Sequence, residues 1–257
     1  VMGSTKYYYR VRVYLNDGSM ILSDTKTVTT SYKTESVTIT TSDGIRLAAK
    51  LKYLGSNNGK KPGIIFMHEL MPFGNNWQKA DVVTNLIAEG YVCLILDFRG
   101  HFSSDYVPLP TEYSQVEEFI YNVSKDLVAS IEFMKSNDVV DGNKLALVGG
   151  SLGSIMAIAG NGYDEVVASV ALSPYSVGIY SVFPDLIINS TLFIAAENNV
   201  NSQGVNFAQE ATAMYNYSEE PKKLIIVPGS SEHGTNLLLE SGITNEIKNW
   251  IIARMEN

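Results

Sequence analysis

The sequence has little of three features that would each point to a class of protein. It contains one cysteine, Cys93, which excludes an intrachain disulfide and a site built from several thiolates. It has no apolar run near the roughly 18–20 residues that a membrane-spanning helix requires. Its 19 basic residues are scattered and are outnumbered by 27 acidic ones, which gives a net charge of −8. We therefore expect neither a membrane nor a nucleic acid as a partner.

Histidine is also scarce, since the 257 residues include only His68, His101 and His233. Each of the three falls at the edge of a strand-like apolar run. Hydrophobic residues make up 45% of the chain, which is enough to bury a large core. The length fits one large α/β domain with about thirty residues left over.

From residue 37 onward the sequence alternates strand-like and helix-like segments. A hairpin is predicted first, from period-two patterns at 37–40 and 45–53 around the turn Ser42-Asp43-Gly44. Six apolar runs follow and are separated by amphipathic segments, which predicts a doubly wound, mostly parallel α/β sheet covered on both faces. The predicted strands are 63–67, 91–96, 145–148, 166–172, 192–196 and 224–227, and the predicted helices are 80–89, 116–135, 151–159, 205–215 and 245–255. Ligands in such sheets bind at the carboxyl ends of the strands.

Residues 1–32 do not follow this alternation. A β-forming run at 5–14, a turn at Asn16-Asp17-Gly18-Ser19 and a second run at 20–30 predict a β-hairpin. The pattern resembles the last two strands of a fibronectin type III domain, with Tyr7 or Tyr9 as the corner tyrosine. We therefore expect a remnant of that domain at 1–32 and a catalytic domain at 33–257. Because an isolated hairpin is marginal in water, it should pack on the catalytic domain or on a second copy, as in a homodimer.

The most informative motif is G-x-S-x-G at residues 149–153, between a predicted strand and a predicted helix. A serine on a sharp strand-to-helix turn needs glycines on both sides, and the turn raises its hydroxyl above the sheet edge. The first amides of the helix, including that of Leu152, then point at the reacting atom. We predict Ser151 as a nucleophile; the alternative is a helix N-cap serine. A dinucleotide loop fails because Ser151 replaces the second glycine of its motif, and a phosphate loop fails for lack of Gly-Lys-Ser/Thr.

Together with this motif, three further stretches resemble the α/β-hydrolase family, of the dienelactone-hydrolase and small-esterase type. Residues 64–70 (IIFMHEL) resemble the loop that supplies the first oxyanion amide, which the resemblance assigns to Leu70. Residues 97–103 (DFRGHFS) resemble the loop after the fourth strand, with Phe102 in place of a glycine. The resemblance implies an α/β-hydrolase fold whose oxyanion hole consists of the Leu70 and Leu152 amides. Only seventeen residues separate Pro174 from Leu192, so we expect no large cap domain.

The third stretch, residues 227–234 (VPGSSEHG), resembles the loop that delivers the catalytic histidine, here His233. A physical reason supports the same assignment. His233 follows the last predicted strand and so emerges at the same sheet edge as Ser151, where an imidazole can act as general base. The alternative is an ordinary surface histidine. We expect His68 and His101 to shape loops by hydrogen bonding rather than to bind a metal.

The third member of the triad departs from the family. In residues 191–200 (TLFIAAENNV), Asn199 stands where the resemblance places an aspartate. Three hypotheses follow: Asn199 acts as a weak third member, Glu197 substitutes for the acid, or the protein is not a catalyst. Side chains at 197 and 199 point the same way if the strand continues, so Glu197 could reach His233 with a small shift. Against Glu197, the family often has an acidic residue there as well as the aspartate. We therefore rank Asn199 as the residue in the third position and Glu197 as the substitute carboxylate.

These observations predict a serine hydrolase that cleaves carboxylic esters with small or polymer-attached acyl groups through an acyl-enzyme. No metal and no organic cofactor is implied. The alternatives are a catalytically impaired binding or scaffolding module, because Asn199 replaces the acid, and a serine peptidase. The fibronectin-like hairpin and the start at Val1 suggest part of a longer, secreted bacterial protein.

Overall fold

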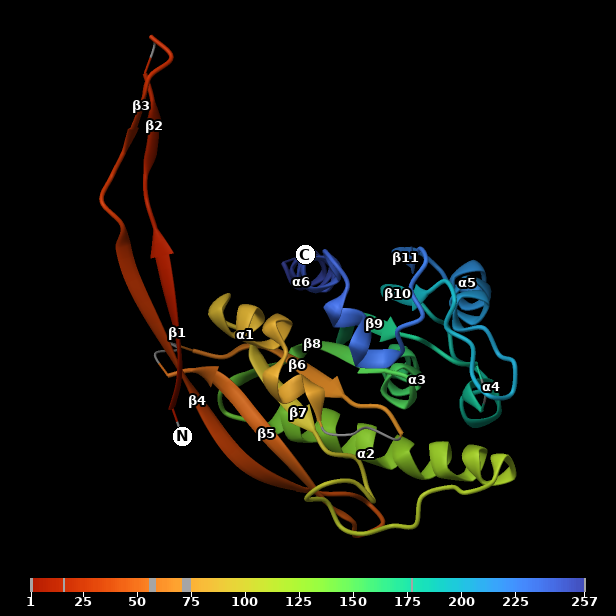
Figure 1. The fold of residues 1–257 in the computed structure, drawn as a ribbon. Helices are drawn as coiled ribbons and strands as arrows, with labels where there is room; N and C mark the ends of the chain where they lie inside the picture. Colours follow the sequence, from red (N-terminus) through yellow and green to blue (C-terminus); the bar gives the residue numbers. More distant parts are fainter. Residues whose placement is uncertain (1, 16, 56–58, 71–74, 177, 257) are drawn as a thin grey trace.

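The computed structural model describes residues 2–15, 17–55, 59–70, 75–176 and 178–256, and its centre is one large β-sheet (Figure 1). Nine strands form this sheet in the order β1, β4, β5, β7, β6, β8, β9, β10, β11. The strands from β7 to β11 in this order pair in parallel, whereas β1, β4 and β5 are antiparallel. Their bounds are β1 Met2–Tyr9, β4 Lys26–Thr40, β5 Arg46–Leu54, β6 Lys61–Met67, β7 Val92–Leu96, β8 Val140–Gly150, β9 Val166–Leu172, β10 Thr191–Ala196 and β11 Lys222–Val227.

Helices cover both faces of the sheet. One buried cluster joins the sheet to α1 (Asp81–Ala88) and α6 (Ile243–Met255), and the other joins it to α2 (Val116–Ser136), α3 (Leu152–Ala159) and α5 (Phe207–Tyr217). In β6, Ile64 and Phe66 belong to the first cluster and Ile65 and Met67 to the second. This alternation is the pleat of a strand buried on both sides, and it explains why the strands are continuously apolar.

The predicted fold class is confirmed: a doubly wound, mostly parallel α/β sheet with helices between the strands. The link between β9 and β10 contains only one short helix, α4 (Ile179–Val182), as expected without a large cap. β4 joins the end of the strand segment predicted at 20–30 and the segment predicted at 37–40 into one strand, and β6, β8, β10 and β11 are longer than predicted. β8 begins at Val140, because Val140 and Asp141 pair with Lys61 and Pro62 of β6. Among the described residues, no helix combines the length and apolar character needed to cross a membrane.

The N-terminal hairpin continues directly into the sheet. β4 pairs with β1 over Lys26–Lys33 and with β5 over Tyr32–Thr40, so the predicted boundary at 32/33 lies inside one unbroken strand. The single strand predicted over 5–14 is divided into β1 and β2 (Arg12–Tyr14), and β2 pairs with β3 (Met20–Leu22) in a separate two-stranded sheet. Asn16 of the predicted turn and the side chains of Tyr7 and Tyr9 lie outside the described part.

The two-stranded sheet projects away from the rest of the molecule (Figure 1). Its apolar side chains are exposed, among them Val13 at 48%, Tyr14 at 68% and Ile21 at 56%. The fibronectin-like origin of this hairpin and a homodimer through it stay predictions.

Candidate active site

Ser151 lies on a sharp turn between β8 and α3. Its backbone has φ 51° and ψ −112°, a conformation with positive φ that costs a non-glycine residue about 1–3 kcal/mol. The turn is held by hydrogen bonds at both ends, since the Ser151 amide donates to Leu172 O (2.9 Å) and Ser151 O accepts from the Ser154 amide (2.9 Å). The surrounding structure therefore maintains this strained conformation.

The two glycines of the G-x-S-x-G motif are required by close packing of backbone on backbone. A Cβ on Gly149 would lie 1.9 Å from Gly153 O, and a Cβ on Gly153 would lie 2.3 Å from Met67 O. Neither contact can be relieved by a side-chain movement, because the atoms concerned are backbone atoms. The glycines let α3 start directly over the ends of β8 and β6.

A mainly apolar cavity of about 290 Å³ opens at Ser151. Its floor and walls come from the loop after β6, the N-terminal part of α2, the start of α3 and the loops after β9 and β10. The lining residues are Leu70, Pro110, Thr111, Glu112, Val116, Phe119, Ile120, Ser151, Leu152, Ile155, Tyr175, Asn201, Gln203 and Phe207. Both predicted oxyanion residues, Leu70 and Leu152, are thus at the same cavity as Ser151.

Two histidines hold the loop after β6. The Phe98 amide donates to His68 Nε2 (3.0 Å), so Nδ1 carries the ring proton and donates to Glu69 O (2.6 Å). Burial lowers the pKa of His68 to about 3, in agreement with a neutral ring. His101 Nε2 lies 2.5 Å from Leu70 O. The Leu70 amide shares its planar peptide with Glu69 O, so His68 also fixes the direction of this N–H.

His233 follows β11 and precedes the 3-10 helix Gly234–Leu239. Its Nδ1 lies 3.0 Å from Asn199 Oδ1, and Asn199 Nδ2 donates to Ser231 O (3.0 Å). Because a carbonyl only accepts, the Ser231 contact fixes which end of the amide faces the ring. His233 therefore carries its proton on Nδ1 and has an unprotonated Nε2. Burial lowers the pKa of His233, and the charge of Glu69 opposes this shift.

The structure separates the two candidates for the third position. Asn199 is buried and contacts His233, whereas Glu197 is exposed and its Oε2 accepts from the Gly229 amide (2.7 Å). The condition for both side chains to point the same way, a strand that continues, is not met, because β10 ends at Ala196 and the chain turns at Glu197 and Asn198. Asn199 is thus the residue that the fold brings to the histidine.

The loops that carry Ser151 and His233 touch each other. A Cβ on Gly150 would lie 3.2 Å from the Cα of Gly234 and 3.1 Å from the Thr235 amide nitrogen. Each glycine is the direct neighbour of one of the two functional residues. Within the part of the chain that the structure describes, no hydrogen bond joins Ser151 Oγ to His233, a bond that often forms only in the substrate complex.

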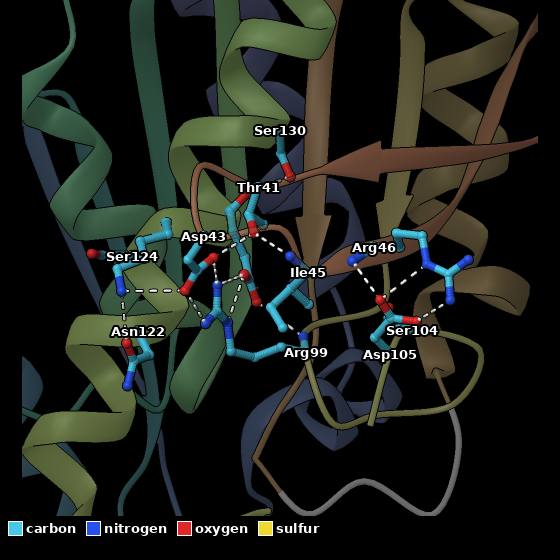
Figure 2. A network of polar contacts seen from close by, with 12 residues as sticks. Thr41, Asp43, Ile45, Arg46, Arg99, Ser104, Asp105, Asn122, Ser124 and Ser130 are labelled. Carbon is cyan, nitrogen blue, oxygen red and sulfur yellow. Dashed lines mark hydrogen bonds and ion pairs between the residues drawn. The ribbon is translucent and has the colours of Figure 1, made fainter. Parts of the chain in front are cut away.

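Arg99, which is 3% exposed, anchors the loop after β7 through two ion pairs. One is with Asp43 of the β4–β5 turn (2.8 Å; Figure 2). The other is with Asp126 of α2 (2.7 Å). The Arg99 guanidinium holds the pKa of Asp43 well below its ordinary value. Phe102 in the same loop has φ 46°, which explains the glycine that the family pattern has at this position. The ion pairs of Arg99 have a structural role, because they hold the loop that contains His101.

Comparison with known proteins agrees with this geometry. The model of the Alpha/beta hydrolase family matches residues 64–222, more than half of the chain. The chain belongs to the alpha/beta hydrolase family. No curated protein matches the sequence.

Several solved structures share the fold of this alpha/beta hydrolase. An esterase of Pyrococcus furiosus is 18% identical, with 87% of this chain and 93% of that chain covered and a TM-score of 0.65. Est1E of Butyrivibrio proteoclasticus, solved with ferulic acid, is 16% identical over 86% of this chain and 100% of its own, with a TM-score of 0.65. A dienelactone hydrolase of Anabaena variabilis is 18% identical over 87% and 99%, with a TM-score of 0.60.

Sequence reasoning missed three residues at the site of this hydrolase. Phe207 lines the cavity and packs against the His233 ring, with ring centroids 4.5 Å apart. The Thr235 amide donates to Glu69 Oε1, which ties the histidine loop to the loop after β6. Glu69 was visible in the sequence only as the residue beside His68. Nothing in the local pattern signalled these contacts, because each joins segments far apart in the chain.

Proposed function

We propose that this alpha/beta hydrolase is a serine esterase that cleaves carboxylic esters through an acyl-enzyme. The observation that carries the proposal is the packing of the turn at Ser151 against the turn at His233. Gly150 and Gly234 are packed together, which brings Ser151 and His233 to one sheet edge, and Asn199 leaves Nε2 of His233 unprotonated. An imidazole in that state can accept the proton of a serine hydroxyl.

In this mechanism, Ser151 Oγ attacks the ester carbonyl and its proton passes to His233 Nε2. The Leu152 amide opens α3 and has no partner inside that helix, so it can donate to the developing oxyanion together with the Leu70 amide. His233 then returns the proton to the leaving alcohol. A water molecule hydrolyses the acyl-enzyme by the same two proton transfers, with water in place of the serine hydroxyl.

The cavity supports acyl groups of limited size. It has about 290 Å³ and is lined mostly by apolar and aromatic side chains such as Phe119, Ile155 and Phe207. A short aliphatic or a single-ring aromatic acyl group fits such a space better than a long lipid chain. The ferulic acid bound to the structurally similar Est1E is of the same aromatic kind. The alcohol part, small or polymeric, would lie outside this cavity.

Reaction with a fluorophosphonate probe tests the serine chemistry directly. We expect a covalent adduct on the native protein, and mass spectrometry of the digested protein should place it on Ser151. p-Nitrophenyl acetate should be hydrolysed, and the labelled protein should lose this activity. Heat-denatured protein is the control and should not react. A folded protein that forms no adduct, or forms it at another serine, would contradict the proposal.

Changing Asn199 to aspartate should raise kcat by about tenfold. The carboxylate would stabilise the imidazolium. In a complete triad, replacing the aspartate by asparagine lowers kcat about 10⁴-fold, but that variant also has the wrong histidine tautomer. Here the tautomer is already right, and one oxygen of the new carboxylate would face Ser231 O, to which the asparagine amide now donates. The gain should therefore be smaller. The measurement is kcat for p-nitrophenyl acetate, and a lower kcat in a folded Asn199→Asp variant would contradict this prediction.

A further inference from the structure

The carboxylate of Glu69 lies between the loops that carry Ser151 and His233. Its Oε1 accepts a hydrogen bond from the Thr235 amide, two residues after His233. A Cβ on Gly234 would lie 2.5 Å from this oxygen, and a Cβ on Gly150 would lie 2.9 Å from it. Glu69 is therefore packed against the neighbours of both residues in the proposed catalytic pair.

The second oxygen of this carboxylate lacks a hydrogen-bond donor in the part of the chain that the structure describes. Glu69 Oε2 is buried and has no hydrogen-bond partner among the described residues. A buried carboxylate oxygen without a donor is costly, and such groups are rare in folded proteins unless they have a function. If Glu69 only filled space, a neutral side chain with one acceptor for the Thr235 amide would fit this position equally well.

The charges around His233 show what this carboxylate can do. On the β10 loop Asn199 is neutral, and the carboxylate of Glu197 is exposed and held by Gly229. On the β11 loop Glu232 adds a second carboxylate next to His233 in the chain, and α5 faces the ring with the apolar Phe207. The charge that acts on the pKa of His233 is that of Glu69, and it raises this pKa against the effect of burial.

We propose that Glu69 is a positioning residue for His233, whose negative charge stabilises the imidazolium in place of the missing triad acid. This inference rests on the esterase function proposed above. When Ser151 attacks, its proton moves to His233 Nε2, and Asn199 Oδ1 still accepts the Nδ1 proton. The proton then leaves with the alcohol, so the carboxylate acts only through its field. In this chain, Asn199 orients the His233 ring and Glu69 supplies the negative charge.

Glu69→Gln tests the proposal because it removes the charge and keeps an oxygen for the Thr235 amide. We expect kcat to fall about tenfold and the acidic limb of the kcat/KM profile to move about one pH unit lower, since one pKa unit corresponds to a tenfold change. In the Asn199→Asp background the same substitution should cost about twofold, because the new carboxylate replaces the lost charge. Glu232→Gln is the matched control and should leave both kcat and the profile unchanged.

A structural role would give a different pattern. If Glu69→Gln lowers kcat equally in both backgrounds and leaves the pH profile in place, the proposal is wrong. Glu69→Asp keeps the charge and serves as the second variant should Glu69→Gln not fold; its acidic limb should stay at the wild-type pH, and a shift as large as that expected for glutamine would overturn the proposal. Absence of a probe adduct at Ser151 in the wild type would instead contradict the esterase function.

Discussion

Replacing Ser151 by alanine should lower kcat for p-nitrophenyl acetate by about 10³-fold to 10⁶-fold and abolish labelling by the fluorophosphonate. Loss of the serine costs about 2 × 10⁶ in kcat in a complete triad. The starting rate here is lower, because Asn199 supplies no charge to His233, so the loss should lie toward the smaller value. Kinetics of the purified variant beside the wild type measure the ratio.

The same substitution should not weaken the fold. The backbone of Ser151, with its positive φ, is as strained for alanine as for serine, and its backbone hydrogen bonds to Leu172 and Ser154 remain. Thermal unfolding of Ser151→Ala should therefore resemble that of the wild type. Ser154→Ala is a useful comparison at a neighbouring buried serine, and it should keep the probe adduct. Residual turnover of Ser151→Ala within tenfold of the wild type would show that another group is the nucleophile.

Arg99→Met should reduce the free energy of unfolding by about 3–5 kcal/mol, the range for breaking a buried ion pair by removing one partner. The substitution leaves Asp126, which is fully buried, without its counter-charge. It also removes the ion pair to Asp43, which connects the β4–β5 turn to the loop after β7. Urea denaturation followed by circular dichroism gives the difference in stability.

Arg46→Met is the matched control for this change. Arg46 also pairs with an aspartate, Asp105 at 2.9 Å, but its side chain is 70% exposed. An exposed ion pair contributes about 0–1 kcal/mol because water and salt screen it. We therefore expect Arg46→Met to change the free energy of unfolding far less than Arg99→Met does. Equal losses from the two substitutions would mean that burial does not decide the strength of this network.

The strand pattern could be predicted because it follows from local chemistry. Continuous apolar runs mark strands that are buried on both faces, and β9 was predicted with the bounds that it has in the structure. β4 was predicted as two separate strand segments, within 20–30 and at 37–40, and the residues between them were missed. The part between them is a strand because it pairs with the start of β1 and the end of β5, contacts that its own local pattern does not contain.

At the site, the order and spacing of the motifs were sufficient to choose Ser151 and His233 as candidates, because residues at the carboxyl ends of parallel strands meet at one edge. They ranked Asn199 first for the third position but left Glu197 open as a substitute carboxylate. That choice depends on where β10 ends and on the Ser231 carbonyl, which fixes the asparagine amide from another loop.

The sequence by itself therefore determined the sheet, the glycines around Ser151 and the absence of an aspartate at position 199, because these follow from residue type and spacing along the chain. Only the tertiary structure decided which groups surround His233. It brings Asn199 to Nδ1 and places the Glu69 carboxylate against Gly150 and Gly234. Charge and hydrogen bonding at the imidazole depend on distances between loops from four different strands, and such distances exist only in the folded chain.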